Sequence, residues 1–426
     1  MIKKNIIEKV FKIHRSLAGD GNRKTLNILS NQASKSIKIK FFKSGKLYNG
    51  WKIPNEWNVK EAFISYKDKK IIDFKSNNLH LIANSVSVDK YLNLNNLKKK
   101  IFTLKNFPSA IPYITNYYSK NFWGFSMQYQ KFRKLIPGKY RVKIDVDKKK
   151  GSMNYGEAFI KGSSKKEIIF ATYICHPQMA NNEISGPVIN TNLLNLIKNF
   201  SKKKKLRYSY RFLFLPETIG TIALLNERLI FLKKNTLAVY VLTCLGTEKK
   251  FKLIQSPYKN TISEKVATQV LNKYSSWEKR SFLQRGSDER QWLSPNVSID
   301  CCSIVTSKYG EYKEYHTSKD DLNFISYKAL KKSTNLFFKI FMEFEKSYFY
   351  FNNSIGEPKM DKFKIYPKIS TKKQKKTVHS FMDVLSFCNG KNNEKSISEY
   401  TNLTLKKTNT ILKFLYKKKL ITHDKN

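Results

Sequence analysis

The chain has 426 residues, of which 41% are hydrophobic and 14% aromatic, so it is long enough for two or three globular domains with sizeable cores. Its formal net charge of +49 suggests a nucleic acid or an anionic membrane as partner. However, Lys, Asn, Ile, Phe and Tyr are abundant together, which favours a general coding bias, with lysines spread over every exposed face, over a dedicated polyanion site.

The five cysteines show no CxxC spacing, and an odd number of thiols in largely apolar surroundings indicates a reducing compartment. No apolar run approaches the roughly 18 residues that a membrane span requires. The sequence therefore predicts a soluble cytoplasmic protein without membrane contact. It does not indicate an oligomeric state.

The chain begins with apolar residues at helical spacing, which predicts an amphipathic helix and not a signal peptide. These residues are Ile2, Ile6, Val10, Ile13 and Leu17. A strand is expected at residues 37–42, and residues 1–50 are assigned to the main body. Residues 51–155 contain short alternating stretches between polar turns, which predicts an inserted β-rich domain with Trp51 and Trp57 in its core.

From residue 156 to 350, strand and helix patterns alternate. The expected strands span residues 167–174, 208–215, 237–245 and 298–305. The expected helices span residues 187–204, 219–232, 262–274 and 327–349. This alternation predicts an α/β sheet with helices on both faces, formed by residues 1–50 and 156–350 together.

Residues 351–376, with two prolines and many lysines, are expected to form a linker. In residues 377–426 we expect a helix to residue 388, a short helix whose capping box is Ser396 to Glu399, a longer helix starting at Thr404, and a strand at residues 420–422. Three helices and a short strand outline a winged helix-turn-helix.

Polar residues follow the ends of four predicted strands: His176, Glu217, Thr247 with Glu248, and His316. In an open α/β sheet, ligands bind at the carboxyl ends of the strands. Metal-assisted hydrolysis needs imidazole and carboxylate ligands and a carboxylate base, which His176, His316 and Glu217 can supply. Considered individually, each histidine is also compatible with a structural role, and the residues alone leave both interpretations open.

The motifs around these positions occur in a characteristic order: residues 180–186 (ANNEISG), 217–220 (ETIG), 287–289 (SDE) and 315–321 (YHTSKDD). This order resembles the zinc aminopeptidase superfamily, which also contains carboxypeptidases and glutaminyl cyclases. More closely, it resembles a bacterial aminopeptidase-like group with an inserted small β domain and a C-terminal winged helix. The resemblance implies a mixed sheet flanked by helices.

The resemblance also implies residue roles. It makes His176 and His316 metal ligands and Glu217 the general base, and it places Asn182 where an aspartate usually bridges two zinc ions. Glu183 is a candidate shifted ligand. The substrate-binding positions that it implies are Asp288, Glu289, Tyr315 and Asp320.

Thr218 and Thr247 stand where the superfamily has further acidic ligands. Hydroxyls and amides bind zinc more weakly than carboxylates do, so the sequence predicts a depleted site with one or two zinc ions. The expected function is a metal-dependent hydrolase that cleaves an N-terminal residue or a related amide from a small substrate. The alternative is a non-catalytic, aminopeptidase-like binding protein with a winged-helix interaction domain.

The third helix of residues 377–426 is rich in lysines that suit phosphate contacts: Lys406, Lys407, Lys413, Lys417, Lys418 and Lys419. It carries no Arg or Gln to read base edges. Nucleic-acid binding by this domain is therefore considered but not favoured over a protein contact.

Overall fold

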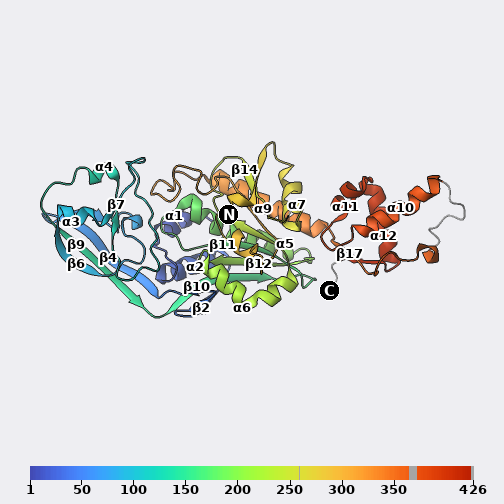
Figure 1. Ribbon diagram of the computed structural model, residues 1–426, viewed down its shortest axis with the longest axis horizontal. Helices are drawn as coiled ribbons and strands as arrows, with labels where there is room; N and C mark the ends of the chain where they lie inside the picture. The colour runs from blue at the N-terminus through green and yellow to red at the C-terminus, as the bar shows by residue number, and fades with distance from the viewer. Residues whose placement is uncertain (259, 364–371, 424–426) are drawn as a thin grey trace.

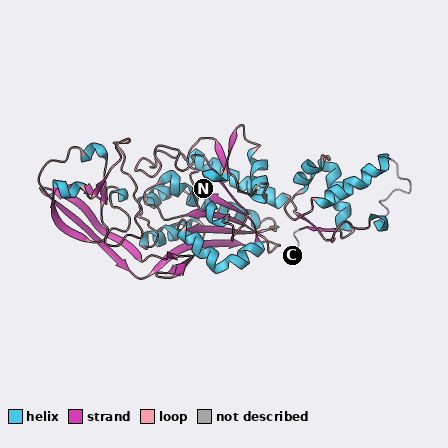
Figure 2. Ribbon diagram, in the orientation of Figure 1, coloured by secondary structure: helices cyan, strands magenta, loops and turns pink. Residues whose placement is uncertain are grey.

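The computed structural model describes residues 1–258, 260–363 and 372–423, arranged as three parts along the longest axis of the molecule (Figure 1). A small β-rich part lies at one end, a large α/β part lies in the middle, and a small, mainly helical part lies at the other end (Figure 2). None of the described helices is both long enough and apolar enough to cross a bilayer.

The central part is built on an eight-stranded mixed sheet with the order β1-β10-β12-β11-β13-β16-β14-β15. Its four middle strands run parallel: β12 (Ser209–Leu215), β11 (Glu167–Tyr173), β13 (Thr236–Leu242) and β16 (Cys301–Val305). The outer strands are β1 (Lys38–Lys43), β10 (Ser152–Ile160), β14 (Phe251–Ile254) and β15 (Trp277–Arg280). Antiparallel pairings β10–β12 and β14–β16 flank the parallel centre.

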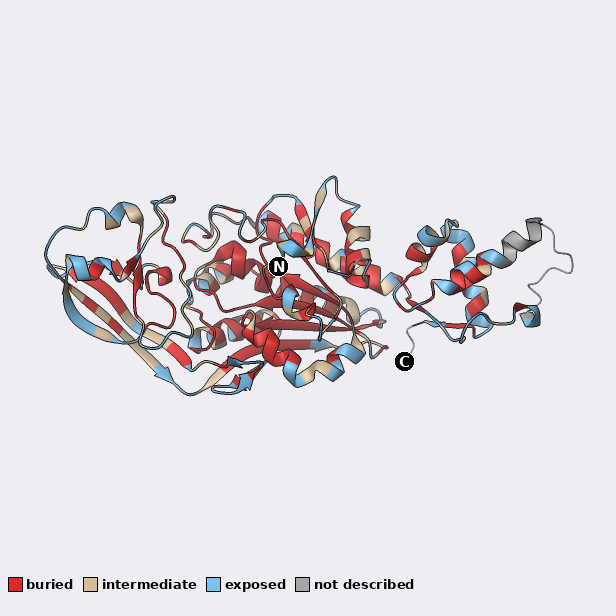
Figure 3. Cartoon of the chain, in the orientation of Figure 1, coloured by how far each residue is buried: buried red, intermediate tan, exposed pale blue. Residues whose placement is uncertain are grey.

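Helices cover both faces of this sheet. One face packs against α1 (Lys4–Lys12), α2 (Asp20–Gln32), α5 (Ser185–Ser201), α7 (Ile262–Leu271) and α9 (Tyr327–Lys346), and the other against α6 (Ile219–Asn235) and α8 (Glu289–Trp292). Alternate residues of one strand enter opposite cores: Phe170 faces the first, whereas Ile169 and Ala171 face the second. The middle strands are therefore buried on both sides, as the central part of Figure 3 shows.

The β-rich part is a four-stranded antiparallel sheet with the order β5-β4-β9-β6. Its strands are β4 (Glu56–Tyr66), β5 (Lys69–Asp73), β6 (Val88–Asn93) and β9 (Lys139–Lys149). Short elements complete it: η1 (Asn78–His80), α3 (Leu94–Lys98), β7 (Ile101–Phe102), β8 (Phe125–Ser126) and α4 (Tyr129–Phe132). The hairpin of β2 (Leu47–Tyr48) and β3 (Trp51–Lys52) contacts α6, and its Tyr48 lies in the core of the central part.

The sequence predicts that Trp51 and Trp57 both lie in the core of the β-rich part, and the structure confirms this only for Trp57. Trp57 is 4% exposed and belongs to the core of this sheet, but Trp51 is 40% exposed. Trp51 lies on β3 next to a tight turn, and its ring packs edge to face with Tyr118, with ring centroids 5.9 Å apart. The prediction that Trp51 is a core residue is therefore wrong.

The C-terminal part consists of α10 (Lys372–Ser386), α11 (Glu394–Thr401), α12 (Leu405–Lys417) and the two-stranded sheet of β17 (Tyr350–Asn352) and β18 (Ile421–His423). Strand β17 lies at the start of the segment expected to be a linker (residues 351–376), of which residues 364–371 lie outside the described residues. Two short 3-10 helices, η3 (Phe282–Gln284) and η4 (Met360–Phe363), occur elsewhere in the chain.

The predicted cap at Thr404 is present, because its side chain accepts a hydrogen bond from the backbone nitrogen of Lys407 at 3.3 Å. The predicted capping box at Ser396 is wrong. The N-cap of α11 is Asn393, whose side chain accepts from the backbone nitrogen of Ser396 at 3.0 Å. Asparagine is an equally strong N-cap, so the helix starts three residues earlier than expected.

Candidate active site

The four parallel strands present their carboxyl ends at one edge of the sheet, where the loops after β11, β12 and β16 meet. His176 follows β11, Glu217 follows β12, and His316 lies in the long loop after β16. All three line one cavity of about 250 Å³. This volume lies below the roughly 300–1,000 Å³ typical of drug-sized ligand sites, so the cavity suits a small ligand.

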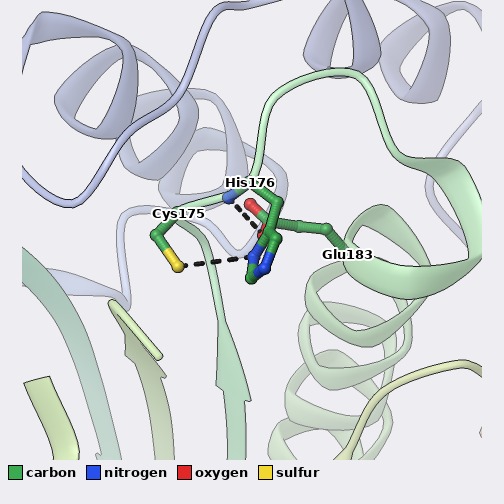
Figure 4. Close-up of side chains that lie close together, drawn as sticks. All are labelled: Cys175, His176 and Glu183. Carbon is green, nitrogen blue, oxygen red and sulfur yellow. Dashed lines mark hydrogen bonds and ion pairs between the residues drawn. The ribbon is translucent and has the colours of Figure 1, made fainter. Parts of the chain in front are cut away.

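His176 is fixed by Glu183. One carboxylate oxygen of Glu183, Oε2, accepts hydrogen bonds from the backbone nitrogen of His176 at 2.6 Å and from its ring Nδ1 at 2.8 Å (Figure 4). The other oxygen, Oε1, accepts from Nε of Arg15 at 3.0 Å, and both side chains of this ion pair are fully buried. Because Nδ1 points at Glu183, Nε2 is the ring nitrogen that faces the cavity.

The turn that carries Glu183 is one turn of π-helix, η2 (Ala180–Ile184), between β11 and α5. Asp320 caps it: its carboxylate accepts hydrogen bonds from the backbone nitrogens of Asn181 at 2.6 Å and Asn182 at 2.9 Å, and from the Tyr312 hydroxyl at 2.9 Å. Burial raises the pKa of Asp320 to about 6. Asp320 thus joins the loop of His316 to the loop of His176.

Glu217 points toward His176, with 3.6 Å between its Oε2 and Nε2 of the ring. Its other oxygen, Oε1, accepts a hydrogen bond from the Ser287 hydroxyl at 3.0 Å. Burial raises the pKa of Glu217 above its usual value, while the charges of His176 and Arg290 act in the opposite direction. A raised pKa is what a carboxylate needs to accept a proton near neutral pH and to release it again.

Asp288 lies behind Glu217. Its two oxygens accept hydrogen bonds from the backbone nitrogen of Thr218 at 2.7 Å and from the hydroxyl of Thr221 at 2.8 Å. Burial, followed by the proximity of Glu217, raises the pKa of Asp288 to about 7. Thr218 has a φ of 63° and a ψ of −74° and is the central residue of a γ-turn, in which the backbone nitrogen of Ile219 donates to the carbonyl oxygen of Glu217 at 2.7 Å. This conformation is unfavourable for a β-branched residue, and the hydrogen bond to Asp288 supports it.

His316 also has a positive φ, of 54°. Its ring stacks on Tyr315 with centroids 3.9 Å apart and lies 5.4 Å from the ring of His176. Burial, together with the charge of His176, lowers the pKa of His316 to about 3, so the ring is neutral. Its Nε2 is buried and has no hydrogen-bond partner among the described residues, as expected for an atom that awaits a ligand.

The four predicted substrate-binding residues do not line the cavity. Glu289 accepts hydrogen bonds from the backbone nitrogens of Gly286 and Ser287 at 2.8 and 3.1 Å, and from the hydroxyls of Ser303 and Tyr309. The carboxylates of Asp288 and Asp320 accept the hydrogen bonds given above, and the ring of Tyr315 stacks on that of His316. In this geometry these residues organise the loops that carry the cavity-lining side chains.

Several cavity residues were not predicted. Tyr113 packs against both histidines, with ring centroids 5.4 Å from His176 and 5.2 Å from His316. Tyr113 lies in the loop between β7 and β8, which also supplies Tyr117 and Tyr118 to the cavity wall. Arg290, which also lines the cavity, lies on α8. The dense aromatic sequence of residues 113–118 was the available signal for this wall, but nothing in the strand pattern connects it to the sheet edge.

The side chains at this edge of the sheet are of the types that bind zinc. His176 Nε2, His316 Nε2 and Glu217 Oε2 face one cavity, and Asn182 Oδ1 is a buried oxygen without a partner among the described residues. The two threonine hydroxyls at the depleted positions are occupied: Thr218 accepts from Arg290 at 2.8 Å, and Thr247 bonds with Thr306 and Ser307 at 3.0 and 2.7 Å. A second ion would lack carboxylate ligands.

Cys175, His176 and Glu183 also lie close enough to resemble a ligand set (Figure 4). Burial raises the pKa of the Cys175 thiol to about 11, so it stays protonated, and its sulfur accepts a hydrogen bond from the backbone nitrogen of Glu217 at 3.2 Å. Both oxygens of Glu183 are bonded to protein groups. This cluster therefore serves as the framework behind His176 and not as an open metal site.

The fold is that of the zinc aminopeptidases. A structure from Bacillus subtilis, the zinc aminopeptidase BSAP, superposes with a TM-score of 0.57 over 80% of this chain and 94% of its own, at 14% identity. A peptidase M28 precursor from Shewanella amazonensis gives a TM-score of 0.56 at 10% identity, over 79% of this chain and 91% of its own.

Two closer relatives come from Clostridium acetobutylicum. A crystal structure provisionally named as a peptidase has 34% identity and a TM-score of 0.79, and the match covers 98% of this chain and 95% of that one. A curated protein, provisionally named as a polysaccharide biosynthesis protein with aminopeptidase-like domain, is 37% identical over 86% of this chain and 83% of its own.

Residues 348–423 match the winged helix-turn-helix family, in agreement with α10 to α12 and the β17–β18 pair. Residues 4–347, which include the inserted sheet and every residue of the cavity, match a single family as one unit. The chain therefore belongs to the aminopeptidase-like family described as a domain of unknown function (DUF4910), extended by a C-terminal winged helix.

Proposed function

We propose that this protein is a metal-dependent amide hydrolase of the aminopeptidase type, which removes an N-terminal residue or cleaves a related amide in a small substrate. One observation carries the proposal: two imidazoles and one carboxylate line the same small cavity. Nε2 of His316 has no partner among the described residues, and Nε2 of His176 lies 3.6 Å from Oε2 of Glu217. In this proposal His176 and His316 hold a zinc ion, with Glu217 beside it and the Asn182 oxygen as an additional weak donor.

Zinc, when bound, supplies Lewis-acid chemistry that polarises a carbonyl and lowers the pKa of water. The protein's own residues do the rest. With zinc bound, Glu183 would accept from Nδ1 of His176 and so leave Nε2 to hold the metal. Tyr113 packs against both histidine rings and limits water around them. Glu217 takes a proton from the attacking water and delivers it to the leaving nitrogen.

The test is hydrolysis of aminoacyl anilides and N-acyl amino acids by the zinc-loaded full chain, compared with Glu217→Gln. The glutamine retains the size of the side chain but cannot carry the proton, and loss of a general base typically costs roughly 10²- to 10⁴-fold in rate. Wild-type turnover that disappears on chelation and in Glu217→Gln supports the proposal. A protein that binds no zinc at micromolar concentration contradicts it.

The second candidate is a non-catalytic protein that uses the same cavity to bind a peptide, an amino acid or a sugar derivative. Thr218 and Thr247 favour this alternative, because they stand where a two-zinc enzyme would have two acidic ligands. Their hydroxyls are already hydrogen-bonded to other side chains. The name of the relative that refers to polysaccharide biosynthesis is compatible with a sugar-derived ligand. Ligand binding without turnover by the zinc-loaded protein would select this alternative.

For the winged helix we propose a protein contact in preference to DNA. Helix α12 exposes lysines, but it has no arginine or glutamine to read bases. A salt-dependent mobility shift of duplex DNA by the full chain, abolished by Lys406→Ala with Lys407→Ala, would show that this domain binds DNA and would contradict the proposal.

The five cysteines are all buried and unpaired, which supports a reducing, cytoplasmic location.

A further inference from the structure

Apart from its two histidines, the described lining of the cavity carries one charged side chain of each sign. Among the described residues that line it, Glu217 supplies the carboxylate and Arg290 the positively charged side chain. The remainder of the wall is aromatic or uncharged, including Trp51 and Tyr118 at the exposed side. A ligand in this cavity therefore meets a general base, a guanidinium and an aromatic surface.

Arg290 is an exposed residue without an anionic partner among the described residues. Its Nη2 donates to the Thr218 hydroxyl at 2.8 Å, and Thr218 is itself anchored to Asp288 through its backbone nitrogen. No described carboxylate forms an ion pair with Arg290, although its charge acts on the titration of Glu217. A guanidinium has five N–H donors in a fixed fork that matches a carboxylate, so most of them remain for a ligand.

A free α-ammonium group fits this cavity poorly. Its only carboxylate partner would be Glu217, which the hydrolysis requires for proton transfer, and it would face the positive charge of Arg290. A substrate with an acylated nitrogen and a free carboxylate has the opposite pattern. Its carboxylate meets Arg290, and its neutral amide lies next to Glu217.

We propose that Arg290 binds the carboxylate of an N-acyl amino acid, with a flat apolar acyl group packed against Trp51 and Tyr118. This inference rests on the proposed hydrolase function and names its substrate class. The reaction adds one water: the water oxygen bonds to the acyl carbon, the carbon–nitrogen bond breaks, and the water proton passes through Glu217 to the amine. The products are a carboxylic acid and a free amino acid.

The Trp51 and Tyr118 rings support the acyl part of the proposal. They are 40% and 51% exposed, they come from segments 67 positions apart, and they pack edge to face while lining the same cavity. Exposed aromatic faces next to a guanidinium bind ligands that combine an apolar ring with an anionic group.

The test compares N-benzoylglycine with N-benzoylglycinamide, both followed by benzoate release from the zinc-loaded full chain. The two compounds differ only in the charge that Arg290 would meet. We expect kcat/KM to favour the acid by roughly 10- to 100-fold, the effect of a charge-assisted hydrogen bond, and mainly through KM. In Arg290→Met the ratio should fall to about 1, and Arg290→Lys should restore part of it.

Arg285→Met is the matched control. Arg285 lies five positions away on the same segment, stacks on Phe282 and does not line the cavity, so this variant should keep the wild-type ratio. A ratio near 1 in the wild type, together with hydrolysis of aminoacyl anilides, overturns the inference and leaves the hydrolase proposal standing.

If neither benzoyl compound is cleaved, calorimetric titration of N-benzoylglycine into the same protein separates the two proposals. Binding that weakens at least about tenfold in Arg290→Met supports the carboxylate site and contradicts hydrolysis. Binding that is absent, or that is unchanged in Arg290→Met, overturns the inference.

Discussion

A single oxygen of Glu183 holds His176 twice, through its backbone nitrogen and through its ring Nδ1. The other oxygen accepts from Arg15, so the carboxylate supports the histidine from behind the cavity. This relationship fixes both the orientation and the tautomer of the proposed zinc ligand. A carboxylate behind a metal-binding histidine commonly affects metal affinity nearly as much as the ligand itself does.

Glu183→Gln should therefore weaken zinc binding by about 10- to 100-fold, measured by competition with a chelator. It should also destabilise the metal-free protein by about 3–5 kcal/mol in urea, because Arg15 keeps a buried charge without its partner. Glu227→Gln is the control, since its ion pair with Lys46 is exposed and its loss should change stability far less. Unchanged zinc affinity in a folded Glu183→Gln variant would contradict the positioning role.

Asn182→Asp should strengthen the site. The amide oxygen of Asn182 is buried without a partner among the described residues, and a carboxylate there would be a better zinc ligand. We expect affinity to rise by about tenfold, or about 1.4 kcal/mol, with one zinc per chain because the Thr218 and Thr247 hydroxyls remain occupied. The metal-free variant should be less stable than wild type, since it buries an unpaired carboxylate. Zinc titration with metal analysis measures both quantities, and an unchanged affinity would place Asn182 outside the site.

Asp320→Ala should loosen the turn that carries Asn182 and Glu183. It removes the acceptor of two buried backbone nitrogens, and each unsatisfied donor costs about 1–3 kcal/mol. Among the described residues, the neighbouring Asp321 accepts only from Asn323 and Phe324 in its own turn, so Asp321→Ala should cost less than about 1 kcal/mol. Urea denaturation of the two metal-free variants measures the loss of unfolding free energy in each. Equal losses would show that the Asp320 carboxylate does not stabilise this turn.

The sequence predicts the sheet well because its middle strands are buried on both faces. Such strands appear as apolar, β-branched runs, and the run predicted at residues 167–174 corresponds to β11 at Glu167–Tyr173. The parallel arrangement then places the residues after β11 and β12 at one edge, which is why His176 and Glu217 could be expected to lie near each other.

The rest of the cavity depends on contacts that periodicity does not encode. Arg15 meets Glu183 across 168 positions, and Trp51 reaches the cavity from a two-residue strand of the inserted part. The role of Glu183 follows from a single π-helical turn, which directs its carboxylate behind His176. The chemistry of a residue can be read from its type, but the direction of its side chain at such a turn cannot.

His14 should make the stability of the protein depend on pH. Its ring is packed edge-on against Trp57 and Phe74, with centroids 5.2 and 4.9 Å away, where the N-terminal segment meets the β-rich part. Burial, together with the charge of Arg15, lowers the pKa of His14 to about 3, against about 6.5 in an unfolded chain. Below pH 6.5 the unfolded chain therefore binds a proton that the folded protein excludes, and the free energy of unfolding falls as pH decreases from 6.5 toward 3.

His14→Phe should make the free energy of unfolding less dependent on pH in this range, measured by urea denaturation between pH 4.5 and 7.5. His379→Phe, at an exposed position on α10, is the control and should keep the wild-type slope. An equal slope in wild type and His14→Phe would show that the ring is not held neutral in the folded protein.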